Sequence, residues 1–389
     1  MQKKGNIYKY FAHNNNGDFM YKKQNYFSIF KILFPLVCFM IVSIISIYSS
    51  QFLLSASYNT LYIKQILWYV IGFIFILLIY KINRQFIYKY IDIIYIFFNI
   101  LLLLVLFFGS STNGSRCWFS VPFIGSFQPS EFMKVVLIIM LSKTLSKYEK
   151  MKKTFKNELI LITKCIIITL IPCILIFLEP DTGLILIYLS ILMIMLFIYG
   201  IRYRWFISFI VIIGIMATIF FTLFFKYQDT FIKIFSTSFF YRIDRLIGFK
   251  NKDSMQLTNA LASLGSAGLF GYGFKNTPIY FPEPHTDFIF AVFSSNFGFI
   301  CSIILILLII YFDLQLIIIS SKCNFNDKLI ITGILSMLLF QQVQNISMNI
   351  GLLPITGITL PFISYGGSSL ISYMITIGII LNIQRKKTI

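Results

Sequence analysis

The sequence predicts an all-α integral membrane protein with about ten transmembrane helices, and two observations carry that prediction. Of its 389 residues, 58% are hydrophobic and only 12% are charged, which is more apolar surface than a soluble domain can bury. The apolar residues also fall in runs of about 20, the length at which a helix crosses a bilayer with its backbone hydrogen bonds satisfied.

These runs predict ten spans in order. They cover residues 28–50, 61–81, 87–108, 131–147, 158–178, 182–200, 204–226, 287–312, 328–349 and 366–384. Residues 1–27 are polar and basic, so we expect a cytoplasmic N-terminal segment followed by a single ten-span membrane domain over 28–389. The first apolar stretch, Phe27–Tyr48, is too long for a typical signal peptide and is expected to remain as a span.

The Lys and Arg residues account for the formal net charge of +19 and orient the spans. They gather at both chain ends and in every second connection, whereas the short connections between carry almost none. By the positive-inside rule, this pattern places both termini in the cytoplasm. The charge therefore indicates topology, and we expect no nucleic-acid partner. The six Cys residues show no metal-binding spacing, so we expect neither a disulfide nor zinc.

This orientation puts the polar and Gly/Pro-rich motifs on the outer side of the membrane. They lie in the connections 114–131, 179–183, 227–286 and 351–369, so we expect the protein to act at the outer face. The last connection, GLLPITGITLPFISYGGSS, has no charge, and such an apolar segment is expected to dip back into the protein. It would then be either part of a site or a structural plug.

Two pairs of charged residues stand at the predicted outer mouths of spans. Glu131 and Lys134 share a helix face, and because a charge inside a span is costly we expect them to pair. The pair would be either a structural ion pair or the lining of a polar cavity. Glu179 and Asp181, in the turn EPDTG, offer the oxygen ligands that Mg²⁺ or Mn²⁺ prefers. The alternative is a solvated turn in which Asp181 caps the next helix.

The long connection 227–286 contains two further features. Its first part is basic, and Arg242 and Arg245 there would meet phosphates or lipid headgroups, unless the segment is a solvated loop with a surface helix. Its end, in the stretch FPEPHTDFIFAVF, places Glu283, His285 and Asp287 directly before a span. Asp287 would be either a helix cap or a general base at the membrane mouth.

Several of these stretches together resemble the SEDS family, which includes RodA, FtsW and SpoVE. In order, they are GSRCWF, FQPSEFMK, EPDTG, LGSAGLFGYG, PEPHTDFIFAV and NIGLLPITGITLPFISYGGSS. Each motif alone is weak, but the ordered set extends over about residues 28–385 and is highly specific. The chain departs from the family at Cys117, where the motif Gly-Ala-x-Arg-Trp has its Arg, and at 294–296, where relatives usually carry two acids.

The resemblance implies a peptidoglycan glycosyltransferase of the bacterial cytoplasmic membrane, active on the outer face in cell elongation or division. Its substrate would be lipid II, a disaccharide-pentapeptide on undecaprenyl diphosphate, and its partner a class B penicillin-binding protein. The family's essential acid falls on Asp287, which would deprotonate the acceptor sugar hydroxyl, while Trp118, Glu131 and Lys134 match positions of the family's central cavity. The other predicted substrate-binding residues are Arg116, Gln128, Ser130, Arg242, Arg245, Glu283, His285, Thr286, Ser364 and Gly366.

Two other functions fit the same topology. The first is a lipid II transporter without chemistry, and the second is a non-catalytic scaffold that activates the penicillin-binding protein. A transporter is expected to need charged residues reachable from both sides, whereas the polar candidates here are almost all external. The sequence indicates no certain cofactor, and a divalent cation, Mg²⁺ or Mn²⁺, is the one candidate.

Overall fold

The computed structural model describes residues 29–55, 58–112, 115–121, 125–235, 237, 240 and 255–385. Its long helices are the first span (Ile29–Leu53), α2 (Leu61–Lys81), α3 (Arg84–Phe108), α4 (Pro129–Lys147), α5 (Phe155–Leu178), α6 (Thr182–Tyr199), α7 (Tyr203–Lys226), α11 (Ile289–Ser321), α12 (Phe325–Asn349) and α13 (Gly367–Arg385). Two shorter helices, α8 (Gln228–Phe235) and α10 (Met255–Gly265), lie between α7 and α11.

The long helices correspond one to one with the predicted spans. Among the described residues, nine of them are long and apolar enough to cross a membrane. The tenth, α4, is less apolar because it carries Glu131, Lys134, Lys143 and Lys147. It packs against α3, α5, α6, α12 and α13, and a helix surrounded by other helices can hold charges that lipid would reject. The expectation of an all-α membrane protein is confirmed.

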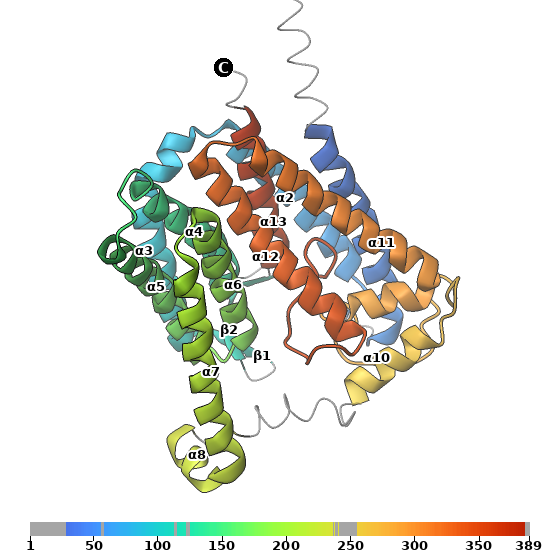
Figure 1. The fold of residues 1–389 in the computed structure, drawn as a ribbon. Helices are drawn as coiled ribbons and strands as arrows, with labels where there is room; N and C mark the ends of the chain where they lie inside the picture. Colours follow the sequence, from blue (N-terminus) through green and yellow to red (C-terminus); the bar gives the residue numbers. More distant parts are fainter. Residues whose placement is uncertain are drawn as a thin grey trace, which may run out of the picture.

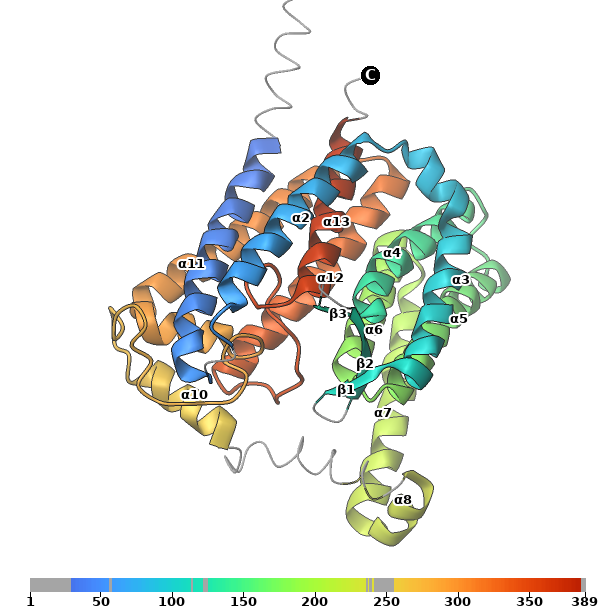
Figure 2. The ribbon, with the colours of Figure 1, turned by 180° about the vertical axis from the view of Figure 1, so that it is seen from behind.

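The helices form two groups joined by a shared centre (Figures 1 and 2). The first span, α2 and α11 lie on one side, and α3, α5 and α6 lie on the other. Between them, α13 packs along α2 and against α4, while α12 contacts α6, α11 and α4. In contrast, α7 extends away from the bundle and ends in the short helix α8 (Figure 1).

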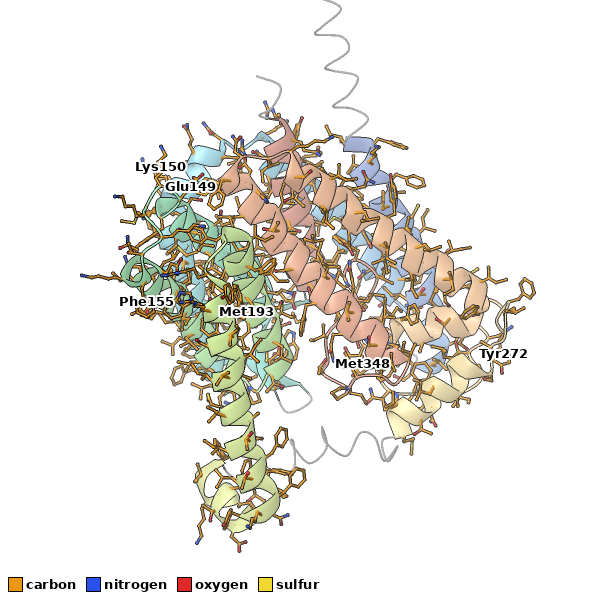
Figure 3. The ribbon with its side chains drawn as sticks, in the orientation of Figure 1. Glu149, Lys150, Phe155, Met193, Tyr272 and Met348 are labelled. Carbon is orange, nitrogen blue, oxygen red and sulfur yellow. The ribbon has the colours of Figure 1, made fainter. Side chains whose placement is uncertain are left out.

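The first span begins and α13 ends at the same end of the bundle (Figure 1). The basic connection near Lys150 lies at the same end, whereas Tyr272 and Met348 lie toward the opposite end (Figure 3). We call that opposite end the distal end. This arrangement agrees with the predicted alternation of basic and non-basic connections; that the distal end faces outside stays a prediction.

Helix α11 is longer than the sequence indicated. The predicted span ended at residue 312, but the helix continues to Ser321 because its apolar pattern continues. It therefore contains Asp313, a buried acid whose Oδ1 accepts a hydrogen bond from Gln342 of α12 at 3.3 Å. The helix also has a kink at Gly298, where φ is 77° and the backbone is not helical.

At this kink, α11 pairs backbone to backbone with the glycine-rich turn that follows α10. The Tyr272 and Gly273 amides donate to Ser295 O and Asn296 O, and the amides of residues 299 and 300 donate to the carbonyls of residues 268 and 269, at 2.9–3.2 Å. A Cβ on Gly271 would lie 2.4 Å from Asn296 O, so only glycine permits this approach.

A small sheet replaces the outer loop predicted at 114–131. Strands β1 (Ser110–Thr112), β2 (Ser115–Val121) and β3 (Gly125–Phe127) pair antiparallel in the order β1-β2-β3. Two of the strands have only three residues each, which is too short for the period-2 alternation that identifies a strand in a sequence. The sheet leads directly into α4.

The segment 351–366 enters the bundle as a re-entrant loop, as predicted. Its residue Phe362 is buried against Phe39 of the first span and Phe312 of α11. The Tyr69 hydroxyl of α2 donates a hydrogen bond to the Phe362 carbonyl. Such partners satisfy the polar backbone of a non-helical segment at membrane depth.

Candidate active site

A cavity of about 1110 Å³ lies at the distal end, with α2 and the start of α13 on one side and β2, α4 and α6 on the other. The re-entrant loop and residues 283–287 complete its wall. The predicted site residues that line it are Trp118, Gln128, Glu131, Asp181, Glu283, His285, Thr286, Asp287 and Gly366. Motifs that lie far apart in the sequence therefore meet in one cavity, whose volume suits a large organic ligand.

The Asp287 carboxylate lies in the cavity wall, next to the re-entrant loop. A Cβ added at Gly357 would lie 3.9 Å from Asp287 Oδ2, so the absence of a side chain there leaves space beside the carboxylate. Burial raises the pKa of Asp287 from 3.8 to about 7, and the negative charges of Glu283 and Asp181 contribute to that rise. A carboxyl group with a pKa near neutrality is suited to act as a general base.

Asp287 does not cap α11, which was the alternative function predicted for it. The N-cap position belongs to Phe288, and no side-chain cap is made from it. Instead, the Ala291 amide in the first turn donates to Asn349 Oδ1 of α12 at 3.0 Å. The Asp287 side chain is therefore not used to terminate the helix.

The segment before Asp287 is held in an unusual conformation. Glu283, between Pro282 and Pro284, has a left-handed φ of 54°, and its Oε2 accepts a hydrogen bond from the Thr286 hydroxyl at 2.8 Å. A non-glycine residue with positive φ is strained, and such strain concentrates at functional sites.

The His285 ring lies between two tyrosines of the cavity wall. Its centroid is 5.7 Å from that of Tyr58 and 5.6 Å from that of Tyr365. Burial lowers the pKa of His285, and the charge of Glu283 partly offsets this effect. The lowered pKa favours the neutral imidazole, and its buried Nδ1 has no hydrogen-bond partner among the described residues.

The EPDTG turn places its two acids differently. Asp181 caps α6 by accepting from the Leu184 amide at 3.4 Å, as predicted, and it also lines the cavity, where Gln128 Nε2 donates to its Oδ2 at 3.1 Å. Burial raises the pKa of Asp181 to about 6. Glu179 is fully buried and does not line the cavity, and burial followed by the charge of Asp181 raises its pKa to about 8. In this turn Glu179 is withdrawn from solvent, whereas Asp181 is partly exposed at the cavity wall and keeps the predicted capping function.

Glu131 and Lys134 form the predicted ion pair, with Nζ and Oε2 at 2.7 Å. Glu131 lines the cavity, whereas Lys134 is completely buried behind it, with Nζ 5.1 Å from the centroid of the Tyr373 ring. Both predicted alternatives, a structural ion pair and the lining of a polar cavity, are thus partly correct. Lys134 is buried in the structure, whereas Glu131 lines the cavity.

Several predicted substrate-binding residues do not line the cavity. Arg116 is exposed on β2, and Ser130 is buried beneath the start of α4. The Ser364 hydroxyl is occupied by the backbone, since it donates to Thr286 O at 2.6 Å and accepts from the Leu360 amide at 2.9 Å. Arg242 and Arg245 lie outside the described residues.

The family of the protein follows from comparison with known sequences. The family model for FtsW, RodA and SpoVE, described as "Cell cycle protein", matches residues 23–389. The chain belongs to this family. It is 33% identical to stage V sporulation protein E of Bacillus subtilis over 299 residues, which cover 74% of this chain and 76% of that protein.

Two further matches extend over nearly the whole chain of this FtsW/RodA/SpoVE-family protein. It is 33% identical over 375 residues to the probable peptidoglycan glycosyltransferase FtsW of Buchnera aphidicola subsp. Baizongia pistaciae, covering 91% of this chain and 93% of the relative. A solved structure, described as "Structural coordination of polymerization and crosslinking by a peptidoglycan synthase complex", matches with a TM-score of 0.74 and 24% identity. That match covers 92% of this chain and 97% of the solved chain.

The cavity of this family member also contains residues that the sequence analysis did not select. Lys64 and Trp68 line it one helical turn apart on α2, and a Cβ at Gly367 would lie 2.6 Å from the Trp68 ring. Tyr58, Tyr365 and several residues of the re-entrant loop complete the wall. A lysine inside an apolar span was a usable signal for Lys64. In contrast, nothing in the sequence distinguished the two tyrosines from other aromatic residues.

The described residues contain no cluster of three or more His, Cys, Asp or Glu side chains placed to bind a metal ion. Of the two predicted cation ligands, only Asp181 faces the cavity. A divalent cation at this site therefore stays a prediction.

Proposed function

We propose that this protein is a peptidoglycan glycosyltransferase that polymerises lipid II at the outer face of the cytoplasmic membrane. The observation that carries the proposal is Asp287, an acid with a pKa raised to about 7, in the wall of a cavity at the distal end. The names of its relatives, among them a probable peptidoglycan glycosyltransferase, support the same reaction.

In the proposed mechanism, Asp287 acts as the general base. Its carboxylate accepts the proton of the acceptor sugar hydroxyl, and the resulting oxygen attacks the anomeric carbon of the donor sugar. A new glycosidic bond forms as the bond from that carbon to the lipid diphosphate breaks, and the diphosphate leaves with its electron pair. The space beside Gly357 would admit the acceptor hydroxyl next to Asp287 Oδ2.

Other residues of the wall have the chemistry to bind the substrate. Lys64 would offset the charge of the diphosphate, and Trp118 and Tyr58 offer flat faces to sugar rings. Asp181 and Glu131 are the carboxylates of the wall that would hold a divalent cation, which when bound would offset the charge of the diphosphate. A chelator that leaves polymerisation unchanged would exclude this role for a cation.

We propose that the protein acts with a class B penicillin-binding protein. The similar solved structure is described as part of a peptidoglycan synthase complex that coordinates polymerisation and crosslinking. Such a partner would crosslink the strands that this chain polymerises.

The test is polymerisation of lipid II by the purified protein, with and without a co-expressed class B partner, followed by separation of the glycan strands on a gel. We expect strands from wild type and at least about a hundredfold less product from Asp287→Asn, since a general base typically contributes that much or more. The matched control is Asp229→Asn, because Asp229 is an exposed acid on α8 that does not line the cavity.

Each outcome separates the candidate functions. If wild type yields no polymer even with its partner, polymerisation is excluded under those conditions, and the result favours the transporter or the scaffold function. If Asp287→Asn polymerises as well as Asp229→Asn, Asp287 is not the base. Size-exclusion profiles must show that both variants remain folded.

A further inference from the structure

The Asp287 carboxylate receives no hydrogen bond from any side chain or backbone group of the described residues, whereas its backbone is held tightly. Its carbonyl accepts two hydrogen bonds, from Asn345 Nδ2 and from Asn349 Nδ2, both at 2.9 Å. The two asparagines are one turn apart on α12 and are both fully buried. The position of the carboxylate therefore depends on the position of the backbone that carries it.

The two preceding carbonyls are held in the same way. The Thr286 carbonyl accepts from the Ser364 hydroxyl at 2.6 Å, and the His285 carbonyl accepts from the Tyr365 amide at 2.9 Å. Every carbonyl from residue 285 to residue 287 thus has a donor from the C-terminal part of the chain. We call this set of hydrogen bonds the carbonyl clamp.

The asparagines also connect the clamp to its surroundings. Asn345 Nδ2 donates to Ile358 O of the re-entrant loop at 2.8 Å, and Asn349 Oδ1 accepts from the Ala291 amide in the first turn of α11. Asn345 therefore fixes Asp287 relative to the loop that contains Gly357. Asn349 fixes Asp287 relative to the helix that follows it. The position of Asp287 relative to the loop and its position relative to α11 both matter, because the base must meet a hydroxyl beside Gly357.

We propose that Asn345 and Asn349 are positioning residues, which hold the Asp287 carboxylate in place through its backbone carbonyl. This inference rests on the proposed glycosyltransferase activity and deepens it. Neither asparagine lines the cavity, so neither touches the substrate. Their loss changes the placement of the base, while every side chain that lines the cavity is retained. A misplacement of about 1 Å lowers a rate by about a hundredfold.

The experiment compares steady-state kinetics of lipid II polymerisation for wild type, Asn345→Ala, Asn349→Ala and the double variant. We expect kcat of the double variant to fall by about a hundredfold and its KM to stay within about threefold of wild type. Ser364→Ala, which removes a single hydroxyl, serves as a milder variant should the double variant fail to fold.

The matched control is Asn382→Ala, at the opposite end of the bundle. Asn382 is another buried asparagine whose Nδ2 donates to three carbonyls, those of Ile79, Tyr80 and Ile82, at 2.8–3.1 Å. Its substitution removes the same kind of asparagine-to-carbonyl hydrogen bonds and leaves those of Asp287 in place. We expect its kcat to stay within about twofold of wild type while its thermal stability falls as much as that of Asn345→Ala.

A second control separates the clamp from the loop. Gln344 Nε2 donates hydrogen bonds to Pro354 O and Thr356 Oγ1 of the re-entrant loop, at 3.1 Å each, and among the described residues it makes no hydrogen bond to residues 285–287. If Gln344→Ala or Asn382→Ala lowers kcat as much as Asn345→Ala, the asparagines only stabilise the fold and the proposal is wrong. It is also wrong if their loss raises KM and leaves kcat unchanged.

A readout without catalysis keeps this inference distinct from the proposed function. Hydrogen–deuterium exchange of the peptide 283–291 is expected to rise by at least tenfold in Asn345→Ala and to be unchanged in Asn382→Ala. If wild type makes no polymer but this difference is found, the proposed function fails and the clamp stands. If wild type polymerises and the exchange is equal in both variants, the clamp fails.

Discussion

Helices α12 and α7 are both long enough to cross a membrane, yet they differ in how much of each helix is buried and in how polar it is. In the most apolar 18-residue stretch of α12, 78% of the residues are buried, whereas none is buried in the corresponding stretch of α7. The buried helix is the more polar one, with Gln341, Gln342, Gln344 and the two clamp asparagines facing its neighbours. The difference teaches that in this bundle polarity marks the helices that build the site, because lipid accepts apolar side chains as readily as a protein core does.

The largest expected effect concerns the buried ion pair of α4, which resembles α12 in its burial. Removing one partner leaves an uncompensated charge, so Lys134→Met should lower the unfolding free energy by about 3–5 kcal/mol. The control is Lys143→Met, whose partner Asp92 is 51% exposed, and its expected cost is about 0–1 kcal/mol. Denaturation in detergent measures both. Equal costs would show that burial does not distinguish the two pairs.

A second prediction compares packing in α12 and α7 directly. Leu338→Ala removes a fully buried side chain of α12, and we expect a cost of about 2–4 kcal/mol. Ile213→Ala shortens a side chain of α7 that is 61% exposed, and we expect less than about 0.5 kcal/mol. Melting temperatures of the two variants test this. A large loss for Ile213→Ala would mean that another surface covers α7.

A third prediction concerns the lysine of the cavity wall. Lys64→Ala should raise KM for lipid II by about tenfold, since a hydrogen bond between charged groups is worth about 1.5–3 kcal/mol. Lys64→Arg should restore most of the affinity. Lys226, at the end of α7, supplies the control, because it does not line the cavity and its substitution by Ala should leave KM unchanged.

The smallest expected effect is a shift in pH dependence. Asp287 accepts a proton only when ionised, and its pKa is raised to about 7, so polymerisation should increase as pH rises through that value. Glu283→Gln removes a nearby negative charge, which makes ionisation easier and lowers the pKa of Asp287. The acid limb of the pH–rate profile should therefore move to lower pH by less than about one unit. A shift to higher pH would contradict this account.

The sequence was sufficient to predict the ten long helices and to place the polar motifs at one end of them, because apolar length and loop charge report both. It was insufficient where a feature depends on packing. Asp313 was placed outside the membrane because the predicted span stopped at residue 312, and the short strands β1 and β3 gave no periodic signal.

The candidate site was predicted in part for the same reason. Asp287 and Trp118 stood out in polar motifs, but the functions of Ser364 and Asn345 depend on which backbone carbonyls lie opposite their side chains. No sequence pattern reports that. Arg116 was selected for its charge, although the sheet that contains it leaves it exposed and outside the cavity wall.

The contact between Gly271 and Gly298 has a mechanical consequence. Because the two backbones touch without side chains between them and share four hydrogen bonds, we expect α10, the glycine-rich turn and the distal part of α11 to move together. Asp287 lies just before α11, so the base is attached to this unit. We then expect any widening of the cavity, to admit a long glycan or release it, to come from walls outside this unit, such as the small sheet and the start of α4.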